Sequence, residues 1–397
     1  MIVDFSPPDI SEEEISAVAE VLRSGWITTG PVTKRFEHEI EAYLGAERCA
    51  CLASATAALE LSLRMLDIGP GDEVITCAYT FTASASVIAH VGAKIVMVDC
   101  EKDAPFIDMD KLGDAITERT KAIIPVDIAG IPVDYKRLNA IVEAKKPMFK
   151  PSGRMQRELG RIAIIADCAH DFGSKFDGIC IPQYADFSCF SFHAVKSLTT
   201  AEGGAVCFRS IGSITSEEIY KHFMLLSLHG ETKDALTKTK AGSWEYDVPL
   251  PGYKANMTDI MAAIGSVQLK RFPGIIARRF EIAKMYEDGL KDNPRILLPE
   301  YENEHIWAIP YVYFIRIKDA SVEERNEIIT KLAVEGIRAN VHFKPLPMMT
   351  GYAKMGFDIG DYPNAYDFYH NEISLPFNTV ITDEQVRFVI DTLNRIC

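Results

Sequence analysis

The sequence lacks a long apolar run and has no excess of positive charge. No run among its 397 residues is long enough to cross a bilayer. The N-terminus, Met1 to Pro8, has neither the basic nor the apolar region of a signal peptide. A net charge of −14 argues against a nucleic-acid-binding protein, which would carry a basic stripe, although a small pocket can still be locally positive. We therefore expect a cytoplasmic protein that binds neither nucleic acid nor membrane.

The sequence also lacks a cysteine framework, internal repeats and low-complexity segments. Its nine cysteines follow no regular spacing, and most lie in apolar runs, as reduced buried cysteines do: Cys49, Cys51, Cys77, Cys100, Cys168 and Cys207. The spacing of Cys189 and His193 is compatible with zinc, but no second pair of ligands accompanies them. We therefore predict no metal site.

Short apolar runs alternate with amphipathic stretches in the first half of the chain. The runs predict strands at 49–53, 73–77, 94–99, 122–126, 162–166, 187–192 and 205–208, and the stretches predict helices at 11–24, 32–44, 57–63, 82–91 and 109–118. This alternation is typical of an α/β fold with a mostly parallel sheet covered on both faces. The basic stretch 145–161 interrupts the alternation, and we expect it to be a solvated loop on the rim opposite the strand ends that carry the site.

The second half of the chain has a different pattern. A long helix is predicted from Thr258 towards Leu290, interrupted at Pro273-Gly274. An α+β pattern follows, with strands at 311–317 and near 337–343 and helices at 322–334 and 383–395. The length also suggests more than one domain. We predict a large α/β domain over 1–258 and a smaller α+β domain over 259–397.

Three features of the first half indicate a cofactor site. Lys196 lies between an alternating aromatic run and the turn-rich segment that ends at Gly204. Asp167 ends the preceding apolar run. Ser54-Ala55-Thr56 joins a strand to a helix, where free backbone N–H groups attract phosphate. Together they suggest an amine that forms a Schiff base with pyridoxal phosphate, and an acid that keeps its pyridine ring protonated.

The same residues should meet at one edge of the sheet. Ligands of open α/β sheets bind at the carboxyl ends of the strands, and Tyr79-Thr80-Phe81 and Ser191 also follow apolar runs directly. Plainer interpretations stay open. Asp167 could only cap a helix, Phe81 could belong to the core, and His170 could be a neutral, satisfied histidine.

Several longer motifs carry a family resemblance. They are Gly25-Trp26-Ile27-Thr28-Thr29-Gly30-Pro31, Gly69-Pro70-Gly71-Asp72-Glu73-Val74-Ile75, the segment around Lys196, and Ser374-Leu375-Pro376. On these motifs the sequence resembles the DegT/StrS family of pyridoxal-phosphate-dependent nucleotide-sugar aminotransferases, which have the aspartate-aminotransferase fold (fold type I). The segments Ser54-Ala55-Thr56, Ser191-Phe192-His193-Ala194, Ala201-Glu202-Gly203-Gly204 and Gly252-Tyr253-Lys254-Ala255-Asn256 are most similar to the branch that makes UDP-4-amino-4-deoxy-L-arabinose.

The resemblance implies a role for each candidate residue. Lys196 would form the Schiff base and move the proton, and Asp167 would pair with the pyridine nitrogen. Phe81 and the Ala169-His170 segment would cover the two ring faces. Ala55, Thr56 and Ser191 would hold the phosphate, with Asn256 reaching the cofactor of the other subunit of a homodimer. Residues proposed to line the sugar site are Trp26, Thr28, His229 and His342, although His229 and His342 could equally be surface or supporting residues.

The resemblance also implies a reaction. L-glutamate would donate its amino group and leave as 2-oxoglutarate. A nucleotide-linked keto sugar, preferably UDP-linked and aminated at C4, would accept it, for surface polysaccharide, lipopolysaccharide or lipid A-type glycans. The rival hypotheses are a sugar dehydratase of the same fold, in which histidine replaces the lysine, and a non-catalytic binding or regulatory protein.

The sequence departs from the family pattern at three positions on the sugar side. Asp127 stands where histidine is usual in the similar branch, and Asp171 stands where a small apolar residue is common. Pro347 replaces a frequent second histidine in the pattern that begins at His342. The exact sugar therefore stays open.

Overall fold

The first half of the chain forms a seven-stranded sheet with the order β1-β9-β8-β5-β4-β2-β3. The computed structural model describes residues 1–233 and 245–397. The strands are β1 (Arg48–Leu52), β2 (Glu73–Cys77), β3 (Lys94–Val98), β4 (Thr120–Ile124), β5 (Ala163–Asp167), β8 (Phe187–Ser191) and β9 (Gly204–Phe208). Every strand runs in one direction except β9, which is antiparallel to both of its neighbours. The predicted mostly parallel α/β sheet is therefore confirmed.

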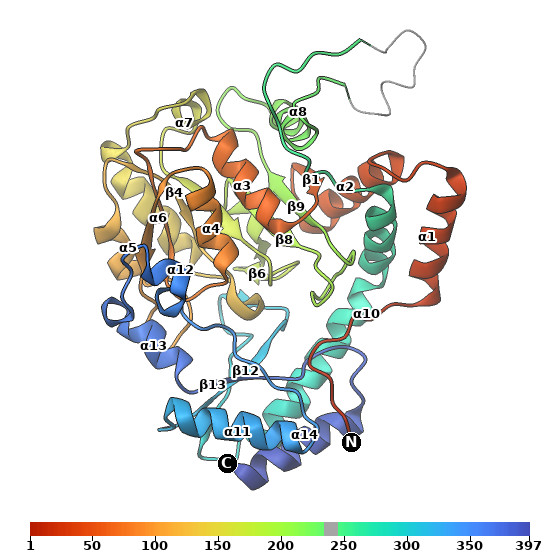
Figure 1. The fold of residues 1–397 in the computed structure, drawn as a ribbon, viewed down its shortest axis with the longest axis vertical. Helices are drawn as coiled ribbons and strands as arrows, with labels where there is room; N and C mark the ends of the chain where they lie inside the picture. The colour runs from red at the N-terminus through yellow and green to blue at the C-terminus, as the bar shows by residue number, and fades with distance from the viewer. Residues whose placement is uncertain (234–244) are drawn as a thin grey trace.

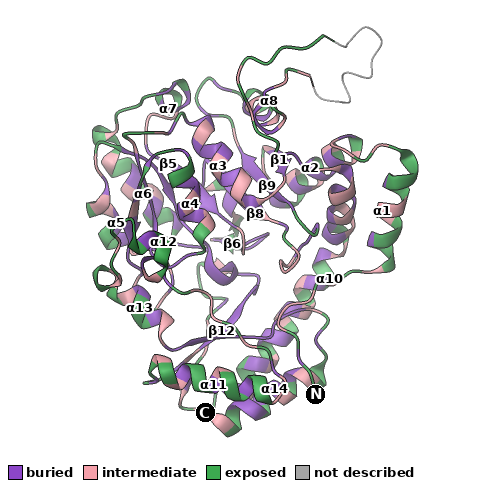
Figure 2. Cartoon of the chain, viewed as in Figure 1, coloured by how far each residue is buried: buried purple, intermediate pink, exposed green. Residues whose placement is uncertain are grey.

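Helices connect and cover these strands (Figure 1). They are α1 (Glu12–Ser24), α2 (Pro31–Leu44), α3 (Ala55–Met65), α4 (Thr82–His90), α5 (Met109–Ala115), α6 (Tyr135–Lys145), α7 (Arg154–Leu159) and α8 (Ser216–Ser227). Sequence signals explain their limits. Ser11 caps α1 in a capping box with Glu14, and Gly25, at φ +75°, ends it. The strands between the helices are buried, whereas helices such as α1 turn an exposed side to solvent (Figure 2).

Helix α10 (Asp259–Leu290) continues without a break through Pro273, so the predicted interruption is wrong. One proline removes one hydrogen bond from a helix, and packing on both sides of it can compensate. Ile275 and Ile282 are buried beyond the proline. The helix packs against α1 and α2 along one part and against α14 (Asp383–Ile396) along another, as Figure 1 shows.

Two small sheets complete the fold. The antiparallel sheet β10-β12-β13 contains β10 (Ile296–Leu297), β12 (Tyr313–Ile317) and β13 (Glu372–Leu375). The sheet β11-β6-β7 joins β11 (Ile306–Trp307) to β6 (Lys175–Phe176) and β7 (Ile179–Cys180). The helices beyond α10 are α11 (Val322–Val334), α12 (Thr350–Ala353), α13 (Pro363–Tyr369) and α14. Both termini lie beside α11 and α14 (Figure 1).

The strand expected near 337–343 does not form. Its backbone makes only isolated bridges, Val3 with Ile337 and Asn340 with Ser374. Beyond these, the N–H groups of His342 and Phe343 donate to side chains, at 3.0 Å to Glu372 and at 2.7 Å to the Tyr79 hydroxyl. Backbone N–H groups that donate to side chains cannot donate to a neighbouring strand, so this segment forms no continuous strand ladder.

The basic stretch 145–161 is also more ordered than a simple loop, because it contains α7 and a short 3₁₀ turn, Lys146–Met148. Its contacts lie near the starts of the strands. The Lys121 ammonium donates to the Lys150 carbonyl at 2.5 Å, and the Gln156 amide donates to the Leu66 carbonyl at 2.6 Å. The stretch therefore lies on the side of the sheet away from the strand ends that carry Asp167 and Ser191.

The nine cysteines are free, and the six expected to be buried are buried. None of the helices within the described ranges combines the length and apolar character needed to cross a bilayer.

Candidate active site

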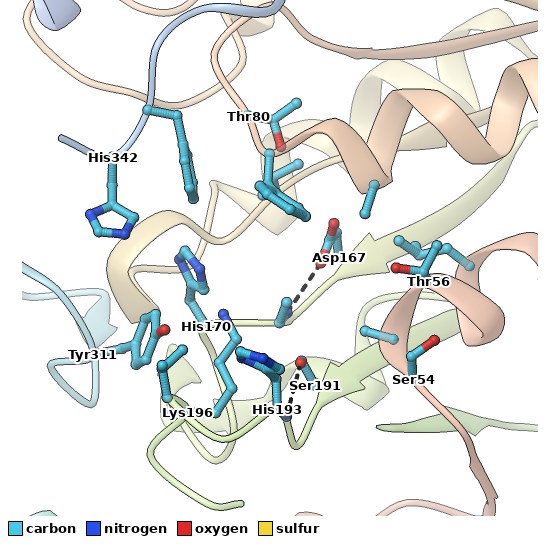
Figure 3. A pocket seen from close by; sticks show the side chains of 18 of the residues that line it. Ser54, Thr56, Thr80, Asp167, His170, Ser191, His193, Lys196, Tyr311 and His342 are labelled. Carbon is cyan, nitrogen blue, oxygen red and sulfur yellow. Dashed lines mark hydrogen bonds between the residues drawn. The ribbon is translucent and has the colours of Figure 1, made fainter. Parts of the chain in front are cut away.

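A cavity of about 350 Å³ opens at the carboxyl ends of the large sheet's strands. This volume falls in the range of small-molecule sites. Figure 3 shows side chains from several strand ends and from the second half of the chain around one space. The lining residues that the sequence predicted are Ala55, Thr56, Phe81, Asp167, His170, Ser191, Lys196 and His342.

One end of the cavity is built by the start of α3. The Ser54 hydroxyl caps this helix by accepting a hydrogen bond from the Ala57 N–H at 3.0 Å. The strand β9 lies directly against this start, since a Cβ on Gly204 would come within 2.4 Å of the Ala55 nitrogen. Backbone donors and the positive end of the helix dipole therefore face the cavity, an arrangement that suits a phosphate group.

Asp167 ends β5 at the floor of the cavity and is only 4% exposed. The Ser84 hydroxyl donates to one carboxyl oxygen at 2.7 Å, and the Ala169 N–H donates to the other at 3.1 Å. Burial raises the pKa of Asp167, while these hydrogen bonds and the Lys196 charge oppose the rise. A cation placed beside the carboxylate would offset its desolvation, so the site suits a protonated ring nitrogen.

Lys196 follows β8 in a tight turn, where its N–H donates to the His193 carbonyl at 2.9 Å. The ammonium lies 4.4 Å from the centre of the Tyr311 ring, a cation–π contact that places the side chain. Figure 3 shows Lys196 and Asp167 on the same cavity, with the start of α3 at one end.

His170 forms part of the cavity wall as a neutral imidazole. Its Nδ1 accepts a hydrogen bond from the Ala129 N–H at 3.2 Å, so the ring proton is on Nε2. Desolvation and the nearby Lys196 charge lower its pKa well below the usual value. The ring packs on Tyr311 at 4.4 Å and on Phe343 at 5.8 Å between centroids. This geometry agrees with the satisfied, neutral histidine that the sequence left open.

The second half of the chain supplies the opposite wall. Tyr311, His342 and Phe343 line it, and the Phe343 ring lies 5.8 Å from the ring of Phe81, which is 56% exposed. Sequence reasoning missed Tyr311 and Phe343 as site residues. Tyr311 and Phe343 each fell at an end of a predicted strand, 311–317 and 337–343, and only the tertiary structure brings them to the cavity.

Four predicted residues do not line the cavity of a single chain: Trp26, Thr28, His229 and Asn256. The contacts of Trp26, Thr28 and Asn256 lie around the N-termini of α2 and α10, whereas the His229 N–H, just beyond α8, donates to the Tyr253 carbonyl at 2.7 Å. The Thr28 carbonyl accepts from the Asp259 N–H at 3.1 Å, and the Asn256 amide donates to the Thr29 hydroxyl at 2.5 Å. Trp26 donates to the Thr29 carbonyl at 3.2 Å. The roles of these four residues in the site stay predictions.

Two departures from the family pattern, Asp127 and Asp171, lie next to each other behind the His170 wall. Both are 1% exposed, and with Cys168 they form a cluster whose polar atoms lie within 4.8 Å of one another. Tyr135 donates to Asp127 at 2.8 Å, whereas one buried Asp171 oxygen lacks a donor. Burial raises the pKa of Asp127 to about 6 and that of Asp171 well above its usual value. We interpret the two carboxyls as sharing a proton, as paired acids do.

This cluster differs from the zinc spacing considered in the sequence, since neither Cys189 nor His193 belongs to it. Within residues 1–233 and 245–397, it is the only group of three or more potential ligands close enough to hold an ion.

The fold and the cavity define a class: a fold-type-I enzyme in which a lysine, an acid and a helix N-terminus meet on one cavity. Comparison with known proteins agrees. The sequence profile of the DegT/DnrJ/EryC1/StrS aminotransferase family matches residues 8–394. The chain belongs to this family and is a pyridoxal-phosphate-dependent aminotransferase.

Individual relatives match over nearly their whole length. The spore coat polysaccharide biosynthesis protein SpsC of Bacillus subtilis is 37% identical over 99% of this chain and 96% of its own. Spr1654 of Streptococcus pneumoniae, assigned as a sugar aminotransferase, superposes with a TM-score of 0.96 at 50% identity over 100% of this chain and 98% of its own. It has also been solved in PLP and PMP forms. PseC of Helicobacter pylori, an aminotransferase of pseudoaminic acid biosynthesis, gives 0.87 at 29% identity over 100% of this chain and 99% of its own.

Proposed function

We propose that this aminotransferase converts a nucleotide-linked 4-keto sugar into the 4-amino sugar, with L-glutamate as amino donor, for the synthesis of a surface polysaccharide or lipid A-type glycan. The observation that carries the proposal is the placement of Lys196 and Asp167 on one cavity beside the N-terminus of α3. Relatives named for polysaccharide and for pseudoaminic acid biosynthesis support a sugar as the acceptor. The motif resemblance supports UDP and the C4 position.

Each residue of this chain has a defined task in the proposal. When bound, the cofactor supplies a carbonyl that carries the amino group and a ring that accepts electrons. Lys196, which lines the cavity, holds the proton that moves between the donor carbon and the cofactor. The Asp167 carboxylate keeps the ring nitrogen protonated, while Ser84 and the Ala169 N–H hold that carboxylate in place. Ala55, Thr56 and Ser191 bind the phosphate at the start of α3.

The proposal includes a homodimer in which each subunit completes the other's site. Asn256 is the proposed link, because it lies outside its own chain's cavity. The Lys254 ammonium donates to the Asn256 amide oxygen at 2.6 Å, so a positive charge accompanies this residue. A phosphate dianion would favour such a charge. We therefore propose that Trp26, Thr28 and His229 contribute to the sugar site of the other subunit in the homodimer.

A panel of UDP-, dTDP- and GDP-linked 4-keto sugars, incubated with enzyme and L-glutamate, tests the proposal. Mass spectrometry should show conversion of the keto group to an amine, together with 2-oxoglutarate, with UDP sugars preferred. Replacing glutamate by glutamine or aspartate checks the donor. Release of ammonia without a stable amino sugar would favour the dehydratase, although the lysine at position 196 speaks against it. No spectral change of the cofactor with any donor would favour a non-catalytic protein.

A further inference from the structure

A chain of three hydrogen-bonded groups connects a buried acid to the cavity. The Glu372 carboxyl contacts the Ser374 hydroxyl at 2.5 Å, and this hydroxyl contacts Nδ1 of His342 at 2.9 Å. Glu372 and Ser374 are fully buried on the same face of β13, whereas His342 lines the cavity. Figure 3 shows His342 on the same side of the cavity as Tyr311.

The other contacts of these groups fix their orientation. The second Glu372 oxygen accepts a hydrogen bond from the His342 backbone N–H at 3.0 Å. The His342 ring stacks on Phe5 with centroids 5.5 Å apart. Because Ser374 engages Nδ1, the ring nitrogen that remains for the cavity is Nε2.

A serine hydroxyl has a single proton, so the three groups admit only two arrangements while His342 is neutral. If Glu372 is protonated, it donates to Ser374, Ser374 donates to Nδ1, and the imidazole proton is on Nε2. If Glu372 is ionised, Ser374 donates to Glu372, Nδ1–H donates to Ser374, and Nε2 has no proton. The protonation of one buried carboxyl thus determines whether the cavity meets a donor or an acceptor.

We propose that Glu372, acting through Ser374, sets the tautomer of His342 so that Nε2–H donates a hydrogen bond to an oxygen of the sugar substrate. The inference rests on the proposed function for the identity of the ligand only. Glu372 and Ser374 are positioning residues, and His342 is the group that would touch the substrate.

Burial supports the donor state near neutral pH. Burial raises the pKa of Glu372 to about 8, although the hydrogen bonds from Ser374 and from the His342 backbone N–H oppose the rise. The Arg325 guanidinium, which lies on α11 and donates to the Glu372 carbonyl at 3.0 Å, opposes it as well. Burial and Lys196 lower the pKa of His342 to about 4, so its ring is neutral. The other titratable groups near these three residues are Tyr79, whose hydroxyl donates to the His342 carbonyl at 2.7 Å, and His170 across the cavity. Arg316 is paired with Glu372 in the sheet, but its guanidinium donates to Asn371, Asp103 and the Asp367 carbonyl.

The test is the tautomer of His342 in substrate-free enzyme, read by long-range ¹H–¹⁵N NMR with ¹⁵N-labelled histidine and assigned from the signal lost in His342→Gln. Wild type should carry the proton on Nε2 at pH 6.5 and change towards Nδ1 with a midpoint near pH 8. Glu372→Gln should keep Nε2–H over the whole range. Its amide oxygen must accept from the His342 N–H, so its NH₂ group can only donate to Ser374.

Two further variants complete the design. Ser374→Ala should abolish the pH-dependent change, whereas Ser188→Ala, which removes a buried hydroxyl from β8 that lacks a partner in the described structure, should leave it intact. In kinetics, Ser374→Ala should raise the KM for the sugar about three- to tenfold, the value of one neutral hydrogen bond, with little change in the half-reaction with glutamate.

The inference is overturned if wild type carries Nδ1–H at pH 6.5, or if Ser374→Ala keeps the same pH-dependent change as wild type. Neither result touches the proposed function, which would still be judged by turnover of the sugar panel. Conversely, an enzyme that shows the expected tautomers but no activity on any keto sugar would support the control of His342 by Glu372. It would contradict the proposed substrate.

Discussion

The two walls of the cavity are built in different ways. The strand-end wall (Ser54, Thr80, Asp167 and Ser191) lies at or just beyond the carboxyl ends of β1, β2, β5 and β8, four strands of one hydrogen-bonded sheet. The C-terminal wall (Tyr311, His342 and Phe343) lies on segments outside regular strands, whose backbone donors go partly to side chains. The hydrogen bonds of a sheet hold the side chains at its strand ends in fixed positions. Hydrogen bonds to titratable side chains, in contrast, can change with protonation. We therefore expect the strand-end wall to control chemistry and the C-terminal wall to control substrate recognition.

The largest expected effect is at the lysine beside the strand-end wall. Lys196→Ala should lower turnover by at least about 10³-fold, because it removes the group that we propose moves the proton. The variant should still bind the cofactor, but without covalent attachment, as measured by mass spectrometry after borohydride reduction. Lys221→Ala, which removes a solvent-exposed lysine from α8, is the control and should behave as wild type. Retained turnover in Lys196→Ala would refute the catalytic assignment.

Asp167→Asn should have the next largest effect. The amide has the shape of the acid without its charge, so the ring nitrogen loses the partner that keeps it protonated. We expect kcat/KM to fall by about 10²- to 10³-fold, the usual range for loss of a preorganised electrostatic contact. Ser84→Ala, which removes one hydrogen bond to the same carboxylate, should cost about tenfold or less. A loss in Asp167→Asn no greater than that in Ser84→Ala would show that the charge is not needed.

Tyr311 tests whether the C-terminal wall also places the catalytic lysine. Tyr311→Ala removes the ring under the Lys196 ammonium and beside His170, and misplacement of a reacting group can cost up to about 10²-fold. Tyr311→Phe keeps the ring and should retain most of the activity. Circular dichroism and thermal unfolding of both variants separate loss of position from loss of fold. If Tyr311→Phe loses as much activity as Tyr311→Ala, the hydroxyl matters rather than the packing.

The smallest expected effect concerns stability behind the His170 wall. In the unfolded chain Asp127 and Asp171 ionise near their ordinary value of 3.8, whereas the folded pair retains a proton to higher pH. The folded state therefore binds more protons, and its stability falls as pH rises from about 4 through about 6.

Asp171→Asn should flatten this dependence, because its NH₂ group replaces the shared proton. Between pH 5 and pH 7.5 the loss in unfolding free energy should be smaller than in wild type by about 1–3 kcal/mol, as measured by urea denaturation of the cofactor-free protein. Asp110→Asn, at a solvent-exposed acid, serves as control. An unchanged pH slope in Asp171→Asn would show that the two acids do not share a proton.

The sequence predicted most of the first half of the fold because local patterns there agree with the tertiary structure. The residues of β2 match the predicted strand fully, and α3 begins at the small and hydroxyl residues that the phosphate hypothesis required. Element ends differ by a few residues elsewhere, as at β12 and α5, where terminal turns are weakly specified. The family resemblance identified the class of enzyme, while the residue roles and the dimer stay predictions.

The failures have a common cause in contacts between distant segments. Helix α10 passes through Pro273 because packing beyond the proline compensates for one lost hydrogen bond. The segment 337–343 is no strand because side chains of Tyr79 and Glu372 take its donors. In the sequence, Asp127 and Asp171 are two separate departures from the family pattern. Only the fold shows that their side chains lie next to each other.

From the sequence alone, the mostly parallel sheet and the strand-end positions of Lys196, Asp167 and Ser54-Ala55-Thr56 could be predicted, because hydrophobic periodicity and strand-end position are local properties. Only the tertiary structure placed Tyr311 and Phe343 on the cavity, brought Asp127 next to Asp171, and linked His342 through Ser374 to Glu372. Those arrangements depend on burial and on partners far along the chain, which no local pattern encodes.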